Sequence, residues 1–380
     1  MQIQSKLPNV GTTIFSVMSR LAMEHQAINL SQGFPNFDCS PDLRDLVSKH
    51  LNEGKNQYVP MPGLPRLREK IATKIENSYA FQVDPESEIT VTAGATQALF
   101  TAIATFIKKS DEVILIEPAY DSYKPAVELM GAICVPYVLK GPEFSVDWDD
   151  FKTLLTDKTK MIIINTPHNP IGKTMKEDDL NMLQSIILEN ELLLLSDEVY
   201  EHLIYDGQMH QSVLKYPELF KRSLLVYSFG KTFHNTGWKI GYCVAPKYLM
   251  KEFRKVHQFN VFSVNSFVQY ALSDFLEDPS NYLSLSDFYQ KKRDAFNSYI
   301  EGSSLKPLKS EGTYFQLFDY RAISEQPDIE FAKWMTEEHK VASIPISVFY
   351  SVPKQTGCIR LCFAKTEETL EQAAQILRLL

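Results

Sequence analysis

The sequence predicts an α/β protein with a mostly parallel central sheet and a second, smaller α+β domain. From residue 88 onward, short runs rich in Val and Ile alternate with segments in which apolar residues recur at helical spacing. Several of the runs are apolar throughout, which is typical of strands covered on both faces of a sheet. The alternation changes near residue 280, so we expect the second domain to begin there.

Seven apolar runs are expected to form the strands of the central sheet. Each run is short for a helix, and its Val and Ile content favours an extended backbone. In chain order, the expected strands cover residues 89–92, 113–117, 133–138, 161–165, 192–196, 224–228 and 242–245.

Helices are expected between these strands. Residues 64–75 place four apolar side chains on one face, and residues 180–187 do the same after a possible capping box of Thr174 with Glu177. Residues 97–109 are apolar nearly all round and end in two lysines, as a buried helix with a favourable C-terminal charge would.

The last hundred residues have a different pattern. A charged helical stretch at 287–300 precedes isolated strand-like pieces at 313–318 and 358–363, and a final helix ends the chain. We expect three regions: residues 1–46 as an N-terminal arm and part of the small domain, 47–280 as the large domain, and 281–380 as the small C-terminal domain.

Composition and charge exclude several function classes. The 380 residues carry 39 Lys and Arg against 47 Asp and Glu, a net charge of -8 that repels phosphate backbones and makes nucleic acid an unexpected partner. No stretch approaches the roughly 18 apolar residues of a membrane span, and the N-terminus lacks a signal-peptide pattern. We therefore expect a cytoplasmic protein without a membrane partner.

The cysteines and histidines predict neither disulfides nor a metal site. The five cysteines are scattered, without a Cys-x-x-Cys pair, as in a protein of a reducing compartment. The eight histidines show no His-Glu-x-x-His or other paired ligand spacing.

One lysine stands out, in the segment 228–242, SFGKTFHNTGWKIGY. Gly230, Lys231 and Thr232 look like the end of a P-loop, but that motif needs glycine at position 225, which is leucine. A lysine that leaves a buried strand into a bend suits Schiff-base chemistry, because partial desolvation lowers the pKa of its amine. The alternative is an ordinary exposed loop lysine.

Six further motifs occur in order over nearly the whole chain: SQGFPNFD, NQYVPMPGLPRLRE, TAGATQAL, NTPHNPIG, SDEVYEHL and CIRLCFAK. With the lysine segment, they resemble those of the fold-type I pyridoxal 5′-phosphate (PLP) enzymes, specifically the class I/II aminotransferases. Within that family, the chain is most similar to the kynurenine, glutamine and methionine aminotransferase branch. The resemblance implies a large domain with a mixed, mostly parallel sheet and a smaller α+β domain.

The resemblance implies catalytic roles for four residues. Lys231 matches the lysine that holds PLP and then moves a proton, and Asp197 matches the carboxylate that pairs with the pyridine nitrogen. Tyr200 and Asn169 match residues that hydrogen-bond the phenolic oxygen of PLP. The local sequence alone also allows a helix N-cap for Asp197 and a simple turn for Asn169.

The resemblance also implies a phosphate site. Ala95 and Thr96 begin a helix whose backbone N–H groups would face the phosphate. Ser228 adds a hydroxyl and Lys239 a positive charge, at a position where the wider family usually has arginine. Tyr58 matches a tyrosine contributed by the partner subunit, so the resemblance implies a homodimer with shared active sites.

Substrate contacts are implied at the remaining positions. Arg360 matches the arginine that clamps the substrate α-carboxylate, and Gly33 matches a loop glycine close to it. Tyr120 matches the aromatic residue that stacks on PLP. Three phenylalanines match pocket residues, one of them from the partner subunit: Phe15, Phe349 and Phe262. Core packing is the alternative for each phenylalanine, and a surface position for Arg360.

The expected function is transfer of an amino group from methionine, glutamine or an aromatic amino acid, including kynurenine, to a 2-oxo acid by a ping-pong mechanism. Two alternatives remain open at this point. A cysteine-conjugate carbon–sulfur β-lyase could use the same residues, and a non-catalytic binding protein could use the same fold.

Overall fold

The computed structural model describes residues 3–352 and 354–380. A seven-stranded sheet forms its centre, in the order β2-β8-β7-β6-β5-β3-β4. All neighbours in this sheet pair in parallel except β8, which is antiparallel to both β2 and β7. The strands are β2 (Ile89–Thr92), β3 (Glu112–Glu117), β4 (Ile133–Val138), β5 (Thr159–Asn165), β6 (Leu193–Asp197), β7 (Ser223–Ser228) and β8 (Gly241–Val244).

Two hydrophobic clusters lie on the two faces of this sheet, which explains why its strands are apolar throughout. On β6, Leu193 and Leu195 belong to one cluster, while Leu194 belongs to the other. The first face is covered by α4 (Ala95–Phe106), α5 (Tyr123–Leu129) and α10 (Lys247–Asn260). The second face is covered by α3 (Pro65–Tyr79), α7 (Glu177–Glu189) and α11 (Ser266–Phe275).

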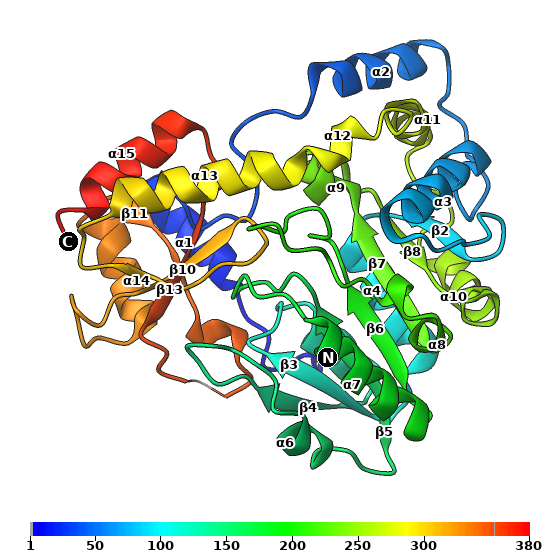
Figure 1. Ribbon diagram of the computed structural model, residues 1–380, viewed down its shortest axis with the longest axis horizontal. Helices are drawn as coiled ribbons and strands as arrows, with labels where there is room; N and C mark the ends of the chain where they lie inside the picture. The colour runs from blue at the N-terminus through cyan, green and yellow to red at the C-terminus, as the bar shows by residue number, and fades with distance from the viewer. Residues whose placement is uncertain (1–2, 353) are drawn as a thin grey trace.

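A second body lies beside the sheet, at the left of Figure 1. Its four-stranded sheet is antiparallel and has the order β12-β13-β10-β9. A two-stranded parallel pair joins β1, near the N-terminus, to β11. The strands are β1 (Ile28–Asn29), β9 (Lys306–Pro307), β10 (Phe315–Asp319), β11 (Val341–Ala342), β12 (Ile344–Pro345) and β13 (Cys358–Cys362), and the helices are α1 (Ile14–Glu24), α13 (Leu285–Ile300), α14 (Asp328–Glu337) and α15 (Glu367–Leu377).

Shorter elements complete the chain. Helix α2 packs on α11, where the His50 ring lies 2.8 Å from the Asp274 carboxylate. The proposed boundary after residue 46 therefore falls inside α2, while the one after residue 280 falls at α12, just before α13 runs toward the second body (Figure 1). These elements are α2 (Pro41–Asn52), α6 (Trp148–Lys152), α8 (Pro217–Phe220), α9 (Phe229–Thr232), α12 (Ser280–Leu283), and the 3-10 turns η1 (Val213–Lys215), η2 (Thr236–Trp238) and η3 (Ser347–Phe349).

Two details of the expected helices are wrong. Helix α7 is preceded by Lys176, whose backbone N–H donates to Asp179 at 2.9 Å, so Thr174 and Glu177 form no capping box. Helix α4 ends at Phe106 because Ile107 is extended, and Lys108 and Lys109 lie beyond it.

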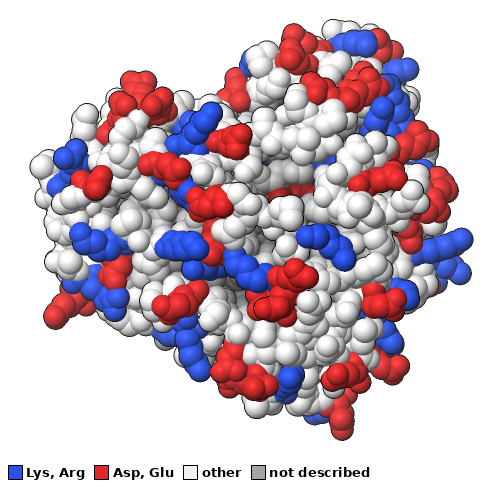
Figure 2. Space-filling view, in the orientation of Figure 1, with Lys and Arg blue, Asp and Glu red and all other residues white. Residues whose placement is uncertain are grey.

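Acidic and basic side chains are interspersed over the face seen in Figure 2. Within residues 3–352 and 354–380, no helix is both long and apolar enough to cross a membrane. The same part of the chain contains no group of three or more His, Cys, Asp or Glu side chains placed to bind a metal ion. All five cysteines are free thiols.

Candidate active site

A cavity of about 250 Å³ lies where β5 and β6 end and meet the second body. Most of the expected site residues line it, although they come from distant parts of the chain. They are Phe15, Gly33, Ala95, Thr96, Tyr120, Asn169, Asp197, Tyr200, Lys231 and Arg360. Ligands of α/β sheets bind at this edge, beyond the carboxyl ends of the strands.

Lys231 lies in the short helix α9, directly after β7. Its Nζ donates to the Tyr314 hydroxyl at 2.9 Å and to the Gly33 carbonyl at 3.2 Å. Burial lowers the pKa of Lys231 to about 8. The tight turn needs glycine at position 230, because a Cβ there would come within 2.9 Å of the Thr236 Cα. Lys231 is therefore a half-buried amine, neutral more often than a surface lysine.

Asp197 is the last residue of β6, and its carboxylate is buried. The Tyr123 hydroxyl donates to its Oδ2 at 2.7 Å, and the backbone N–H of Val199 donates to Oδ1 at 3.3 Å. Burial raises the pKa of Asp197 to about 6. The residues after it form a turn and not a helix, so the N-cap alternative does not hold. A carboxylate so placed is suited to pair with a cation in the cavity.

Arg360, on β13, is fully buried at the opposite wall of the cavity. Its Nη1 donates to Asn169 Oδ1 at 2.6 Å, its Nη2 donates to the Ser31 carbonyl at 3.2 Å, and its guanidinium lies 3.8 Å from the Phe315 ring centre. Its Nε has no hydrogen-bond partner among the described residues. Burial lowers the pKa of Arg360 to about 10. A buried cation with a free donor is suited to bind an anion.

The N-terminus of α4 and two neighbouring residues form a second cationic corner. Ala95 and Thr96 occupy the first turn of α4, after Gly94 with a φ of +77°. A Cβ on Gly94 would lie 3.4 Å from the Lys239 ammonium. Ser228 of β7 is opposite Gly241 of β8 in the sheet. A Cβ added to Gly241 would come within 3.2 Å of the Ala95 nitrogen. Backbone N–H groups of the first turn, a hydroxyl and an ammonium therefore lie close together at this corner.

Aromatic rings surround the rest of the cavity. Phe15 and Phe349 pack edge to face with ring centres 6.0 Å apart, and the Phe349 ring centre lies 5.3 Å from the Arg360 guanidinium. Tyr120 lies near Thr96, edge-on to Tyr123 with 5.7 Å between ring centres. These rings leave an apolar rim around the polar groups.

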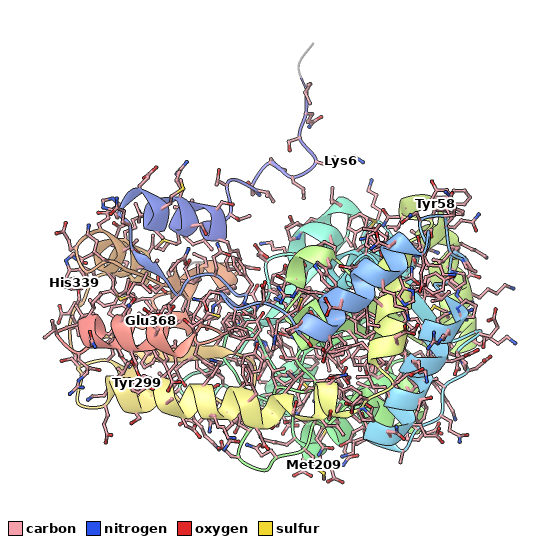
Figure 3. All side chains as sticks on the ribbon, turned by 90° about the horizontal axis from the view of Figure 1, so that it is seen from above. Lys6, Tyr58, Met209, Tyr299, His339 and Glu368 are labelled. Carbon is pink, nitrogen blue, oxygen red and sulfur yellow. The ribbon has the colours of Figure 1, made fainter. Side chains whose placement is uncertain are left out.

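Five expected residues do not line the cavity of this chain. Ser228, Lys239 and Phe349 lie next to residues that line it. The other two, Tyr58 and Phe262, lie at the surface. Tyr58 is 80% exposed and Phe262 is 45% exposed, and their rings contact each other with centres 5.2 Å apart. In Figure 3, Tyr58 lies at the upper edge of the molecule. The N-terminal segment around Lys6 extends from the same edge. Both residues are expected to serve the cavity of a partner subunit, and neither reaches the cavity of its own chain.

Sequence reasoning missed two tyrosines in this site. Tyr123 donates to Asp197, and Tyr314 accepts from Lys231. The strand-like pattern of residues 313–318 includes Tyr314. However, the alternation of side chains along a strand predicts only the face of the sheet on which a side chain lies. The contact with Lys231 arises from the packing of two segments that are distant in the sequence. No local sequence pattern predicts it.

The chain matches the family model "Aminotransferase class I and II" over residues 25–377. It is 51% identical to methionine aminotransferase of Escherichia coli over 376 residues, covering 99% of this chain and 97% of that protein. It is 34% identical to human kynurenine–oxoglutarate transaminase 1, covering 94% and 93% of the two chains.

Solved structures match over the whole chain. The crystal structure of the E. coli protein, whose report identifies a methionine aminotransferase function, has a TM-score of 0.98 at 51% identity and full coverage of both chains. N-succinyldiaminopimelate aminotransferase from Mycobacterium tuberculosis has a TM-score of 0.96 at 32% identity, again with full coverage. The expected fold is confirmed, with its mixed seven-stranded sheet and small antiparallel body.

Proposed function

We propose that this chain, which belongs to the class I and II aminotransferase family and is an aminotransferase, uses PLP to transfer the amino group of L-methionine or a related amino acid to a 2-oxo acid. The family uses PLP. Glutamine and aromatic amino acids, including kynurenine, are the further donors that we propose. The single observation that carries the proposal is one cavity lined by a half-buried lysine of low pKa, a buried carboxylate and a buried arginine.

The cavity has the donors that PLP needs. The α4 N-terminus with Thr96, Ser228 and Lys239 would hold the phosphate, and Asp197 would keep the pyridine nitrogen protonated. Tyr120 would cover one face of the ring, and Tyr200 with Asn169 would hydrogen-bond its phenolic oxygen. The positive φ of Gly94, directly before the α4 N-terminus and beside the Lys239 ammonium, supports this assignment because it turns the first N–H groups of the helix toward one corner.

Lys231 is the residue proposed to hold the cofactor and then to move a proton. When bound, PLP withdraws electrons from the carbon that carries the amino group, so that its proton becomes acidic. The Lys231 amine, once free, is a base with a pKa near working pH, which is the range in which proton transfer is most efficient.

Arg360 is proposed to hold the α-carboxylate of the substrate. Its Nη1 is already held by Asn169, so the guanidinium is fixed before the substrate arrives. Gly33 lies beside it, and Phe15 and Phe349 would contact the substrate side chain. Apolar and sulfur-containing side chains fit such an aromatic rim.

We propose a homodimer in which each subunit completes the other's site. Tyr58 and Phe262 are exposed neighbours, and Phe259, three residues before Phe262, is 87% exposed. A large exposed aromatic cluster is typical of a protein interface. Tyr58 would then reach the phosphate of the partner subunit's cofactor, and Phe262 its substrate pocket.

The test is the visible absorption spectrum of the full chain with PLP, before and after L-methionine. We expect a cofactor band that methionine bleaches and a 2-oxo acid restores, since the two halves of a ping-pong reaction are separable. A band that Lys231→Ala retains unchanged would contradict the role of this lysine. Release of pyruvate and ammonia from a cysteine conjugate, without any 2-oxo acid, would identify the β-lyase alternative instead.

A further inference from the structure

The free amine of Lys231 is held by two oxygens that the assigned roles do not explain. One is the Gly33 carbonyl at 3.2 Å, and the other is the hydroxyl of Tyr314 at 2.9 Å. Tyr314 lies directly before β10, is fully buried, and does not line the cavity.

The direction of the hydrogen bonds is fixed by a third contact. The Tyr314 hydroxyl donates its only proton to the Gly33 carbonyl at 2.6 Å. Its oxygen therefore offers only lone pairs to Lys231, and the amine has to donate. The three atoms form a closed triangle, so both oxygens lie on the same side of the nitrogen.

This arrangement orients the neutral amine. Its N–H groups face two oxygens that repel its lone pair, so the lone pair points away from both of them. The same two oxygens stabilise the ammonium ion after the amine has taken up a proton, since hydrogen bonds to a charged donor are stronger than those to a neutral one.

The surrounding packing holds the triangle in place. The Tyr314 ring contacts the rings of Tyr200 and Phe315, with centres 5.2 Å and 4.9 Å away. A Cβ at Gly33 would come within 2.8 Å of Phe315, so only glycine lets this carbonyl approach so closely. The hydroxyl and the carbonyl therefore have little freedom to move apart.

We propose that Tyr314 is a positioning residue for Lys231: its hydroxyl, held by the Gly33 carbonyl, fixes the free amine through its N–H groups, with the lone pair directed away from both oxygens, and stabilises the ammonium ion. This inference rests on the proposed function, in which Lys231 moves the proton. Tyr314 itself touches neither the substrate nor the cofactor.

The test variant is Tyr314→Phe, which keeps the ring and its packing. The control is Tyr289→Phe, because Tyr289 is equally buried, its ring centre lies 5.8 Å from that of Tyr314, and its hydroxyl has no partner in the described part of the chain. Thermal unfolding of both variants checks that each is folded.

The first readout does not depend on activity. Trace acetylation of the full cofactor-free chain by acetic anhydride, followed by mass spectrometry of the Lys231 peptide across a pH series, gives the proton affinity of this amine. We expect a midpoint near pH 8 in the parent chain. In Tyr314→Phe the proton affinity should fall about tenfold, as loss of one hydrogen bond to a charged group implies. Tyr289→Phe should keep the parent midpoint.

The second readout separates kcat from KM in the PLP-loaded chain. We expect Tyr314→Phe to lower kcat on the order of 10- to 100-fold with little change in the KM for the donor, because Arg360 still binds the carboxylate. An unchanged Lys231 midpoint, an unchanged kcat, or an equal loss in Tyr289→Phe would each overturn the proposal. A parent chain that forms no cofactor band would overturn the proposed function instead, while the midpoints would still decide whether Tyr314 holds the amine.

Discussion

Asp197 carries a carboxylate in surroundings that disfavour its charge. Burial raises its pKa to about 6, against an ordinary value of 3.8. The folded chain without cofactor therefore binds this proton more tightly than the unfolded chain does. The contribution of Asp197 to the free energy of unfolding is most favourable below about pH 4 and is lost as the pH rises to about 6. A cationic partner in the cavity would remove this penalty.

Asp197→Asn should for this reason stabilise the cofactor-free chain at neutral pH. The gain should be at most about 3 kcal/mol at pH 7 and should vanish below about pH 4, where the parent carboxyl is itself protonated. Tyr123 keeps an acceptor in the amide oxygen. Urea unfolding at several pH values measures the difference, and a gain that does not vary with pH would contradict the explanation. Transamination should be lost, since a neutral amide does not hold a pyridine nitrogen protonated.

Arg360→Lys tests the substrate anchor at the same scale. A lysine keeps the charge but loses the planar fork that Asn169 and the Ser31 carbonyl now hold. We expect the KM for every amino donor to rise on the order of 100-fold, with cofactor retention unchanged. Steady-state kinetics and a PLP titration measure the two effects. An equal loss of cofactor would show that the arginine acts on the fold instead.

Residues of this kind differ in how far the sequence reveals them. Lys231 and Asp197 lie in motifs at the ends of strands, and Arg360 lies in a motif that covers a strand, so their positions could be predicted. Tyr123 and Tyr314 could not, because each acts through one contact with a distant segment. Tyr58 and Phe262 are a third case, since their expected place lies across a subunit boundary.

The turn after β6 serves two sites at once. Asp197 and Tyr200 line the cavity, while Glu198 and Glu201 point into a buried polar network. Glu198 lies 2.9 Å from the His210 ring nitrogen and accepts from the Tyr227 hydroxyl at 3.1 Å. The network therefore fixes the backbone that presents the two cavity residues.

Glu201 in this network is paired with Lys74 of α3, whose Nζ lies 2.6 Å away. Burial alone would raise the pKa of Glu201, but the Lys74 ammonium, the nearby His202 and the hydrogen bonds from Lys74 and Tyr79 together outweigh burial and lower it to about 2. The stabilisation from this pair is present above about pH 4.5 and is lost as the pH falls toward 2.

Lys74→Met should leave Glu201 buried and unpaired. We expect a loss of about 3–5 kcal/mol in the free energy of unfolding at pH 7. The matched control is Lys74→Met with Glu201→Gln, which removes both charges and should recover part of the loss. Urea unfolding measures both variants, and equal losses would show that packing around Lys74 matters more than charge.

The sequence predicts some helices and strands better than others, and the reasons are physical. The central strands follow from long apolar runs, because a sheet covered on both faces needs them. The two-residue strands β1, β9, β11 and β12 are too short to have a pattern. The ends of helices depend on single residues, as at Lys176 and Ile107. The sequence pattern does not predict these ends.

The whole molecule exposes Tyr58 and Phe262, which are in contact, and also Phe259, three residues before Phe262. If the proposed dimer forms there, Phe259→Asp should weaken it on the order of 100-fold, because a charge would be buried in an apolar interface. Leu379→Asp is the control, since Leu379 is equally exposed, at 85%, but at the C-terminus. Analytical ultracentrifugation measures both. A Phe259→Asp protein that stays dimeric would place the interface elsewhere.

The pairing of β1 with β11 also has a consequence for synthesis of the chain. Residues 28–29 find their partner only at residues 341–342. A ribosome needs roughly 15 to 60 seconds to make the intervening segment at typical rates. The large sheet can form during that time, while residues 28–29 still lack the strand with which they pair. The N-terminal segment, which carries Phe15 and Gly33 to the cavity, is therefore among the last parts to be put in place, and the active site closes only when translation is nearly complete.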